Sequence, residues 1–483
     1  MFTFGVTLSL LAAKATFAFI ADSNVTDACA QIASAISSAS DVYYPLSVQY
    51  DEDIEHWAGS STQEATCSVE PGTVDDVGKI LQIVGLTRTP FAVKGGGHAT
   101  NVGFSSTTGV QVSMTRFNNI TLSEDMATVD IGAGLTWDEV YDALDGTGMN
   151  VVGGRVTGVG VAGLTLGGGY SWKTSQYGLT IDNVAEFELV LPNGTVQSVT
   201  AENEDLWLAL RGGMNNFGIV TNFKFNTVPQ SDVWGGVITM TGDQFPAVSA
   251  AIANFSANNT DTKAAILPSY NSAAGLPGML LILFYDDATQ PGLFDAFMDI
   301  PAVTSDVKTR SFVDFVTSIP ISLAPPVRGA FHTTSVLGYS PAILDLIVNM
   351  TLTYGPELAL LDSAVLISID VEPFASTLFT HGSDSAWPPS RSQALLPTNV
   401  YFSWVLPSAD EMMWAVMEEI EGNVTALAVA EGQDVEHAAK YGNEALGDTT
   451  VEEIYGNNVV RLRSIREAVD PEDVMGLAGG FKF

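Results

Sequence analysis

The stretch VKGGGHATN, residues 93–101, constrains the fold of this chain more than any other, because three consecutive glycines run directly into His98. Glycine lets main-chain N–H groups approach a ligand closely and adopts positive φ at little steric cost. A succession of such N–H groups can form an anion-binding nest. A tight turn between two strands explains the same glycines without any ligand, so the loop alone leaves both interpretations open.

Two familiar phosphate-binding loops are excluded. The string G-x-x-x-x-G-K-[ST] of a Walker loop does not occur in the chain. A Rossmann loop opens a helix, whereas the glycines here are followed by alternating, strand-like stretches at 109–117 and 126–134. A phosphate-binding role would therefore belong to another nucleotide fold, with Lys94 as the nearest cation in the sequence.

The flanking sequence predicts alternating helices and strands. Apolar residues at helical spacing predict a helix before the loop (Val74, Val77, Ile80, Leu81 and Val84), followed by a strand over 91–94. A second helix is expected within 136–148, and a region containing eight glycines follows between Gly153 and Gly169. Residues 184–200 read as a β-hairpin that turns at Asn193-Gly194, and 204–225 as a helix, a glycine turn and a strand.

The pattern changes beyond about residue 230. Strand-like stretches at 278–287, 364–374 and 399–406 alternate with amphipathic helical stretches at 340–355 and 409–423, and glycine-rich loops become rare. This predicts a second α+β domain built around an antiparallel sheet. A total of 483 residues suits two sizeable domains.

The charge balance excludes two classes of partner. Asp and Glu outnumber Lys and Arg by 55 to 19, which gives a net charge of −36. This charge repels phosphate backbones and anionic membranes, so neither nucleic acid nor membrane is an expected partner.

Residues 1–21 are interpreted as a secretory signal peptide, with small residues at Ala18 and Ala21 for cleavage. A membrane anchor is the alternative, but Lys14 interrupts the apolar run that an anchor needs.

Sequons and cysteines agree with secretion. Seven N-x-Ser/Thr sequons predict N-glycans, at Asn24, Asn119, Asn193, Asn254, Asn258, Asn349 and Asn423. In an oxidising compartment the only two cysteines, Cys29 and Cys67, are expected to form a disulfide rather than remain as two buried thiols. So few cysteines and histidines make a dedicated metal site unexpected.

Four segments, taken in chain order, carry a resemblance to a known family: PFAVKGGGHATNVGFSSTTGVQVSM, GVGVAGLTLGGGYSWKTSQYGLTIDNVAEFELVLPNG, LWLALRGGMNNFGIVTNFKF and YGNNVVRLRSIREAVDPEDVMGLAGGFKF. They resemble the berberine-bridge-enzyme-like FAD-linked oxidoreductases of the larger vanillyl-alcohol-oxidase-like family. The resemblance implies an α+β fold with a two-part PCMH-type FAD-binding domain, formed by residues 22–230 and 431–483. An inserted α+β substrate domain on an antiparallel sheet would span residues 231–430.

The resemblance also implies cofactor contacts. His98 falls at the position that bonds covalently to the 8α-methyl carbon of the flavin. Many relatives have a second, cysteinyl link where this chain has Val156, so we expect a single covalent bond; oligosaccharide oxidases generally resemble the doubly linked form. The full set of expected FAD-binding residues is Gly95, Gly96, Gly97, His98, Ala99, Asn101, Gly158, Val159, Gly160, Gly163, Asn183, Ile219 and Asn443.

The resemblance implies an oxidase that passes hydride from a substrate C–H bond to FAD and then electrons to dioxygen, giving hydrogen peroxide. Val159 aligns where a small residue admits dioxygen, although simple packing also explains it. Relatives often carry Y-x-N-Y-A where this chain reads YGNEA, which makes Tyr441 and Glu444 the candidate catalytic residues; an exposed glutamate is the alternative for the latter. Tyr177 and Trp404 are further candidates to line the substrate pocket.

The expected substrate is a small alcohol, phenolic, amine or sugar-type molecule. Two other functions remain open at this point: a flavin dehydrogenase or cyclase of a secondary-metabolite pathway, and a secreted carbohydrate-binding glycoprotein without catalysis. A yellow colour of the purified protein would distinguish the oxidase and the dehydrogenase or cyclase, which bind flavin, from the carbohydrate-binding glycoprotein, which does not.

Overall fold

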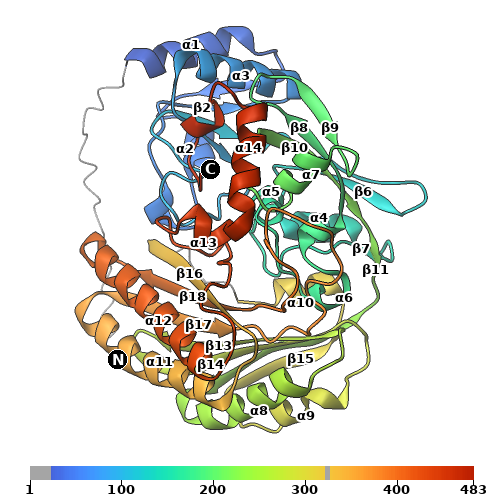
Figure 1. Cartoon of the computed structure of the whole chain (residues 1–483), viewed down its shortest axis with the longest axis vertical. Coiled ribbons are helices and arrows are strands. Elements are labelled where there is room, and N and C mark those ends of the chain that lie inside the picture. The colour runs from blue at the N-terminus through green and yellow to red at the C-terminus, as the bar shows by residue number, and fades with distance from the viewer. Residues whose placement is uncertain (1–22, 321–326) are drawn as a thin grey trace, which may run out of the picture.

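The computed structural model describes residues 23–320 and 327–483. The expected signal peptide lies outside the described residues. Figure 1 shows two units: elements from both ends of the chain lie together in the upper half, and a large sheet with its helices forms the lower half.

Two sheets build the upper unit. The first is mixed, in the order β1-β2-β4-β3, with bounds Asp41–Tyr43, Cys67–Glu70, Val110–Ser113 and Phe91–Lys94. The second is antiparallel, in the order β5-β6-β10-β8-β9, with bounds Ile120–Leu122, Thr128–Gly132, Ile219–Asn226, Val184–Val190 and Val196–Val199. A short ribbon of β7 (Met149–Asn150) and β11 (Val228–Pro229) leads towards the lower unit.

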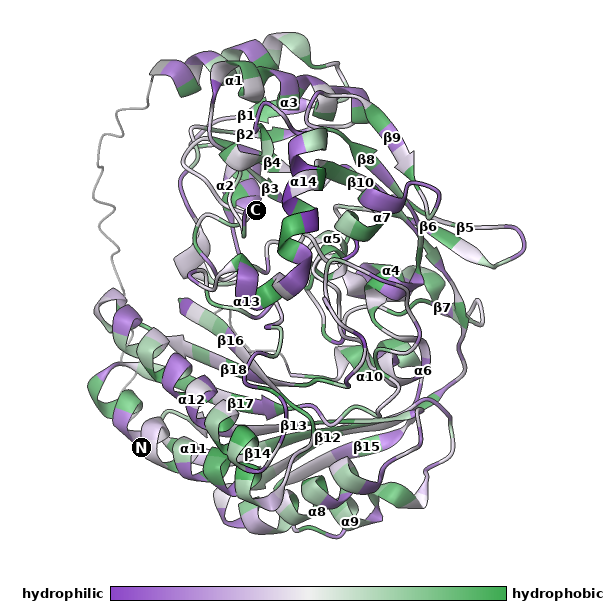
Figure 2. Cartoon of the chain, in the orientation of Figure 1, coloured by the Kyte–Doolittle hydropathy of each residue, from purple (hydrophilic) through white to green (hydrophobic). Residues whose placement is uncertain are grey.

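The lower unit is a seven-stranded antiparallel sheet, in the order β15-β12-β14-β13-β17-β18-β16. The bounds in that order are Thr304–Arg310, Val233–Thr241, Leu276–Tyr285, Ala264–Ala273, Ala364–Val371, Leu396–Trp404 and Arg328–Val336. Helices α11 (Pro341–Leu361) and α12 (Asp410–Ala430) pack on one face, and α8 (Phe245–Asn258) packs against α11. Hydrophobic and hydrophilic residues alternate along α12 (Figure 2), as expected for a helix that covers a sheet. The expected antiparallel sheet is confirmed.

The remaining helices belong mainly to the upper unit. They are α1 (Ser23–Ala35), α2 (Val48–Ile54), α3 (Val74–Thr87), α4 (Trp137–Leu144), α5 (Val161–Leu166), α6 (Thr174–Tyr177), α7 (Glu204–Leu210), α13 (Val451–Tyr455) and α14 (Val459–Val469), while α9 (Asp295–Met298) and α10 (Phe312–Thr317) accompany the lower sheet. Helix α14 packs against α7, which places C-terminal residues in the unit built by the N-terminal half (Figure 1). None of the helices in the described ranges has the length and apolar content needed to cross a bilayer.

Helix α3 illustrates how the sequence determines an element. Thr73 precedes it, and its hydroxyl accepts a hydrogen bond from the Asp76 N–H, while Asp75 and Asp76 lie in the first turn, where the helix dipole favours negative charge. Four of the five predicted apolar positions are fully buried, and β3 follows at Phe91–Lys94. The predicted helix and strand are confirmed, as is the hairpin of β8 and β9 around Gly194.

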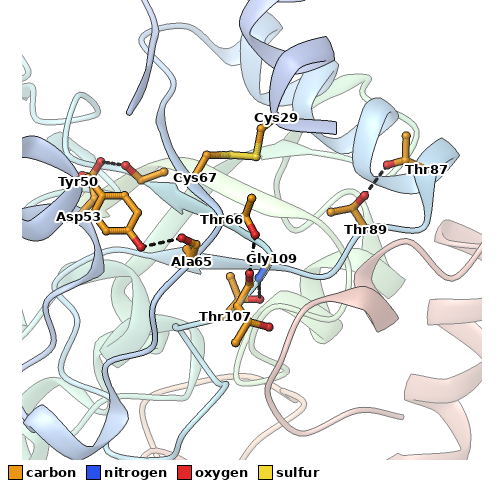
Figure 3. The surroundings of a disulfide bond; sticks show 12 residues. Cys29, Tyr50, Asp53, Ala65, Thr66, Cys67, Thr87, Thr89, Thr107 and Gly109 are labelled. Carbon is orange, nitrogen blue, oxygen red and sulfur yellow. Dashed lines mark hydrogen bonds between the residues drawn. A yellow bond between two sulfur atoms is a disulfide. The ribbon is translucent and has the colours of Figure 1, made fainter. Parts of the chain in front are cut away.

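A disulfide joins Cys29 on α1 to Cys67 at the start of β2 (Figure 3), which confirms the expected pairing. Both cysteines are fully buried. Beside the bond, the Tyr50 hydroxyl donates to the Ala65 carbonyl at 2.6 Å. The disulfide therefore ties the first helix to the sheet that carries the glycine loop.

Candidate active site

A cavity of about 760 Å³ separates the glycine segments of the upper unit from the inner face of the seven-stranded sheet. This volume lies within the range of about 300–1,000 Å³ that is typical of ligand and cofactor sites. The cavity brings together most of the predicted site residues: all of Gly95–Asn101, Val156, Val159, Gly160, Gly163, Ile219, Tyr441, Asn443 and Glu444.

The two glycine-rich segments touch at Gly96 and Gly160. A Cβ atom on Gly96 would lie 2.5 Å from the Gly160 nitrogen, and a Cβ on Gly160 would lie 2.4 Å from the Gly96 nitrogen. Side chains at either position would force the two main chains apart. The next residue, Gly97, has φ +68°, a left-handed conformation that favours glycine.

The loop Gly95–Asn101 lines the cavity along its whole length. Among the described residues, none accepts a hydrogen bond from the N–H groups of Gly95–Asn101. Gly97 is buried and the other six residues are partly exposed. A succession of N–H groups without such acceptors fits an anion such as a diphosphate. Lys94 does not contribute, because its Nζ points away and donates to the Glu52 and Glu55 carbonyls at 2.7 and 2.8 Å.

His98 lies against an aromatic side chain. Its imidazole stacks on the Trp57 ring with centroids 4.4 Å apart and planes 15° apart. The Nε2 atom is buried without a hydrogen-bond partner in the described part of the chain. Burial lowers the pKa of His98 to about 4, so the ring is neutral at physiological pH. A neutral imidazole with an unpaired nitrogen on a cavity wall can act as a nucleophile.

The C-terminal segment is hydrogen-bonded to both glycine segments. Asn101 Nδ2 donates to the Ala445 carbonyl at 2.9 Å, and Asn443 Nδ2 donates to the Leu164 carbonyl at 3.0 Å. The Tyr441 oxygen accepts from Asn443 Nδ2 at 2.8 Å and from the Gly169 N–H at 3.2 Å. Burial raises the pKa of Tyr441, so the phenol is neutral and its own proton is available to a ligand.

Three carboxylates face the cavity close to a single arginine. Glu372 forms a bidentate ion pair with Arg155. Asp370 accepts from the Ser368 hydroxyl at 2.5 Å and from Asn399 Nδ2 at 3.2 Å, and burial raises its pKa to about 6. Glu444 Oε2 has no partner among the described residues; burial, then the charge of Glu372, raises its pKa to about 8.

Sequence reasoning missed four residues of this site: Trp57, Arg155, Asp370 and Glu372. One signal for the two acids was present in the stretch ISIDVEPF. Ser368 and Asp370 lie at every second position of the otherwise apolar strand β17, and Glu372 follows directly after its last residue in the same alternation, and all three line the cavity. Such residues at the end of a buried strand need a polar environment, which the cavity provides.

Four candidate residues do not line the cavity. Gly158 is exposed, and its N–H donates to Asp138 Oδ1. Asn183 Nδ2 donates to the Tyr177 and Leu179 carbonyls. Tyr177 also lies outside the lining, and Trp404 is buried with its Nε1 donating to Asp410.

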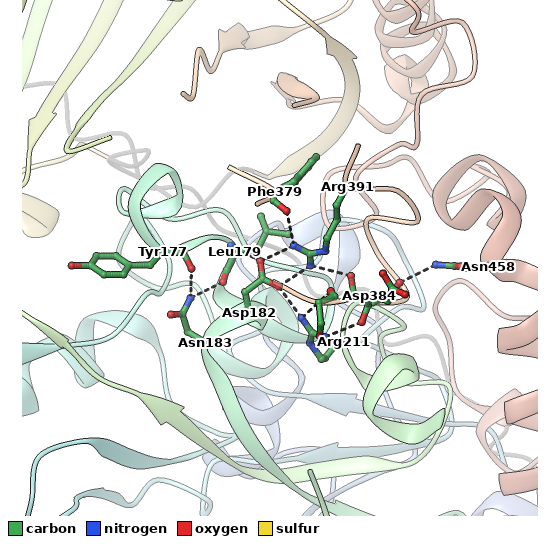
Figure 4. Close-up of polar contacts among 11 residues, drawn as sticks. Tyr177, Leu179, Asp182, Asn183, Arg211, Phe379, Asp384, Arg391 and Asn458 are labelled. Carbon is green, nitrogen blue, oxygen red and sulfur yellow. Dashed lines mark hydrogen bonds and ion pairs between the residues drawn. The ribbon is translucent and has the colours of Figure 1, made fainter. Parts of the chain in front are cut away.

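Asp182, which precedes Asn183, organises a separate buried cluster (Figure 4). Its Oδ1 accepts from Arg211 Nη2 at 2.9 Å and from Arg391 Nη2 at 2.7 Å. Arg211 also donates to the Ser383 hydroxyl, which fixes the long connection between β17 and β18 against the upper unit. Within that connection, the Trp387 ring lies 4.7 Å from that of Tyr441, so the cluster supports the site from behind.

The cavity therefore combines main-chain donors that lack an acceptor among the described residues, a neutral imidazole and a cluster of carboxylic acids. These features fit a dinucleotide cofactor with a substrate beside it, the arrangement of a flavin-dependent oxidoreductase. The profile of a family described as FAD binding domain matches residues 65–200, the segment that holds both glycine clusters. In the described residues, no group of three or more His, Cys, Asp or Glu side chains is arranged to hold a metal ion.

Comparison with related sequences identifies the family to which the chain belongs. The FAD-dependent monooxygenase tpcD of Cochliobolus heterostrophus is 30% identical over 457 residues, which cover 88% of this chain and 86% of that protein. The chain belongs to the berberine-bridge-enzyme-like group of FAD-linked oxidoreductases. Three other curated relatives align over only 52–61% of their own length.

Solved structures share the fold. 6-Hydroxy-D-nicotine oxidase from Arthrobacter nicotinovorans superposes with a TM-score of 0.77, covering 92% of this chain and 97% of that one at 19% identity. Glucooligosaccharide oxidase from Acremonium strictum, with a 6-S-cysteinyl, 8α-N1-histidyl FAD, gives the same TM-score, coverage and identity. These likenesses confirm the expected PCMH-type α+β architecture.

Proposed function

We propose that this protein is an oxidase with FAD bound covalently through His98 and reoxidised by dioxygen. When bound, FAD accepts a hydride from a substrate C–H bond and passes two electrons to dioxygen, which yields hydrogen peroxide. The observation that carries the proposal is one cavity that joins the glycine loop and His98, whose Nε2 has no partner among the described residues, to the carboxylates Asp370, Glu372 and Glu444. The substrate is a small alcohol, phenolic, amine or sugar-type molecule with an O–H or N–H group beside the oxidised carbon.

The protein's own residues handle the substrate proton. Glu444 lines the cavity, its Oε2 has no partner in the part of the chain that the structure describes, and it receives the proton from the substrate O–H or N–H. Tyr441, whose oxygen already accepts two hydrogen bonds, donates its own proton to the substrate and orients it. The pair of Arg155 and Glu372 holds the adjacent wall of the site in place.

The link to His98 is single. Both cysteines of the chain are joined to each other, and Val156 lines the cavity at the position where relatives carry a second link. Acid denaturation of the yellow protein tests the link: flavin should precipitate with wild-type polypeptide and remain in solution with His98→Ala. A wild-type pellet free of flavin would disprove the covalent bond, and a colourless protein would disprove the function.

Val159 lines the cavity next to Gly160, which supports access of dioxygen. A second candidate function, transfer of one oxygen atom to the substrate, is favoured by the relative named as a monooxygenase. Turnover under ¹⁸O₂ separates the two. The oxidase puts the label only into hydrogen peroxide, whereas a monooxygenase puts it into the product; a dehydrogenase leaves reduced flavin stable in air for minutes.

The protein is secreted and N-glycosylated. All seven sequon asparagines lie at exposed positions, where an oligosaccharide fits without rearrangement of the fold. Expression in a eukaryotic host, with and without peptide N-glycosidase treatment of the medium fraction, tests both statements. Protein retained inside the cell with unchanged mobility after treatment would contradict them.

A further inference from the structure

Trp57 lies in the segment between α2 and β2 and forms part of the cavity wall beside His98. Its main-chain N–H donates to the Gly97 carbonyl at 3.0 Å, one residue before the histidine. The segment that carries the indole is therefore fixed directly to the glycine loop. The two rings lie almost parallel, with their centroids 4.4 Å apart.

The sheet of the lower unit supports this stack. The Phe331 ring lies 5.7 Å from that of Trp57 at 15°, and 6.0 Å from that of His98 at 21°. Phe331 is paired with Tyr401 across β16 and β18, and these two rings are 4.9 Å apart. The imidazole interacts with the main chain of His98 itself, and its Nε2 atom has no hydrogen-bond partner among the described residues, so the ring contacts are what other residues contribute to its orientation.

We propose that Trp57 is a positioning residue for covalent flavin attachment: its face holds the His98 imidazole in the orientation from which a ring nitrogen bonds to the flavin. The inference rests on the proposed function. In this step an N–C bond forms to the 8α carbon, while one C–H bond of that methyl group and one imidazole N–H bond break. The two electrons and two protons end on dioxygen as hydrogen peroxide.

The physical reason is orientation. A side chain with two free torsions loses reactivity when its nucleophilic atom samples many directions, and fixing it near the reacting carbon removes that entropy from the barrier. Stacked aromatic pairs favour offset parallel geometry over other arrangements. The contact also excludes water from the imidazole, which keeps its lone pair unprotonated.

The test measures the rate of attachment. Wild type, Trp57→Ala, Trp57→Phe and a control, Trp414→Ala, are expressed under riboflavin limitation, mixed with FAD, and sampled into acid over time. Trp414 lies on α12 with 40% of its surface exposed, away from the cavity. We expect Trp57→Ala to attach flavin about tenfold more slowly, while Trp57→Phe and Trp414→Ala stay near the wild-type rate.

Each possible result either supports or overturns the proposed role of Trp57. Attachment by Trp57→Ala at the wild-type rate would overturn it, as would Trp57→Phe behaving like Trp57→Ala. If Trp57→Ala does not fold, Trp57→Leu keeps bulk without an aromatic face, and a wild-type rate in that variant would equally overturn the role of the ring. Absence of acid-stable flavin in wild type would instead mean that the proposed covalent function itself fails, and the role of Trp57 with it.

Discussion

Gly96 and Gly160 lie with their main chains in direct contact, at a distance that leaves no room for a Cβ atom on either residue. The sequence left two interpretations of the first glycine loop, a tight turn or an anion nest. The contact shows that close packing against Gly160 requires a bare loop, whereas the anion nest stays a prediction. The loop must be bare where it meets the second glycine segment, and its N–H groups have no acceptor among the described residues.

We therefore expect Gly96→Ala to destabilise the protein and to reduce its flavin content. The added methyl group would overlap the Gly160 main chain, and overpacking of this kind costs about 1–3 kcal/mol. Gly422→Ala is the matched control, because Gly422 lies inside α12 with nothing within 4 Å of the added carbon. That control should gain about 0.5–1 kcal/mol. Thermal unfolding measures the stability of both variants, and the ratio of flavin to protein absorbance measures their flavin content. A melting temperature of Gly96→Ala equal to that of wild type would contradict the steric argument.

The sequence predicted those parts of the site that depend on local pattern or on the family resemblance. His98, Asn101, Tyr441 and Asn443 lie together as expected, because each belongs to a recognisable segment. Trp57 and Arg155 were missed, because only the tertiary fold brings them to the cavity. Helix α11 shows a similar limit: the pattern predicted its end near Gly355, but tertiary packing carries it through Pro356 to Leu361.

The pH dependence of turnover identifies the base. If Glu444 takes the substrate proton, kcat/KM should rise with pH and level off above about 8, the pKa to which burial raises this carboxyl. If Asp370 does so, the rise should end near pH 6. Glu444→Gln should lower kcat/KM by about 10²–10⁴-fold. A rise centred near pH 6, with near wild-type activity in Glu444→Gln, would assign the role to Asp370.

Burial of Glu444 also has a consequence for stability. Its folded pKa is raised from 4.5 to about 8, so between these values the folded state binds more protons than the unfolded state, and stability falls as pH rises. Glu444→Gln removes this titration. The free energy of unfolding of the variant should therefore exceed that of wild type increasingly from pH 5 to pH 8, by on the order of 1 kcal/mol or more at the upper end. Urea unfolding at pH 5 and pH 8 measures the free energy of unfolding of both proteins. A difference between variant and wild type that is the same at the two pH values would contradict the prediction.

The disulfide should contribute measurably to stability. Cys29 and Cys67 are 38 residues apart, and closing a loop of that length in the unfolded chain is worth about 4 kcal/mol. Cys29→Ala with Cys67→Ala should lower the melting temperature, and a reducing agent should lower it in wild type but not in the double variant. The control is clean because the chain has only these 2 cysteines. An identical response of both proteins to the reductant would contradict the assignment.

Removal of the negative charge at Asp182 should be among the most damaging conservative changes outside the cavity. The carboxylate is fully buried and pairs with the buried Arg211 and the partly buried Arg391, so Asp182→Asn removes the counter-charge that these two guanidinium groups share. Loss of one partner from a buried ion pair costs about 3–5 kcal/mol.

Asp205→Asn provides the contrast, because its ion pair with Arg461 is exposed and should be worth no more than about 1 kcal/mol. Since the cluster holds the connection that carries Trp387 against Tyr441, Asp182→Asn should also increase proteolysis between residues 375 and 395 and reduce turnover. A variant that unfolds with the wild-type midpoint and resists protease equally would show that the two arginines find other partners.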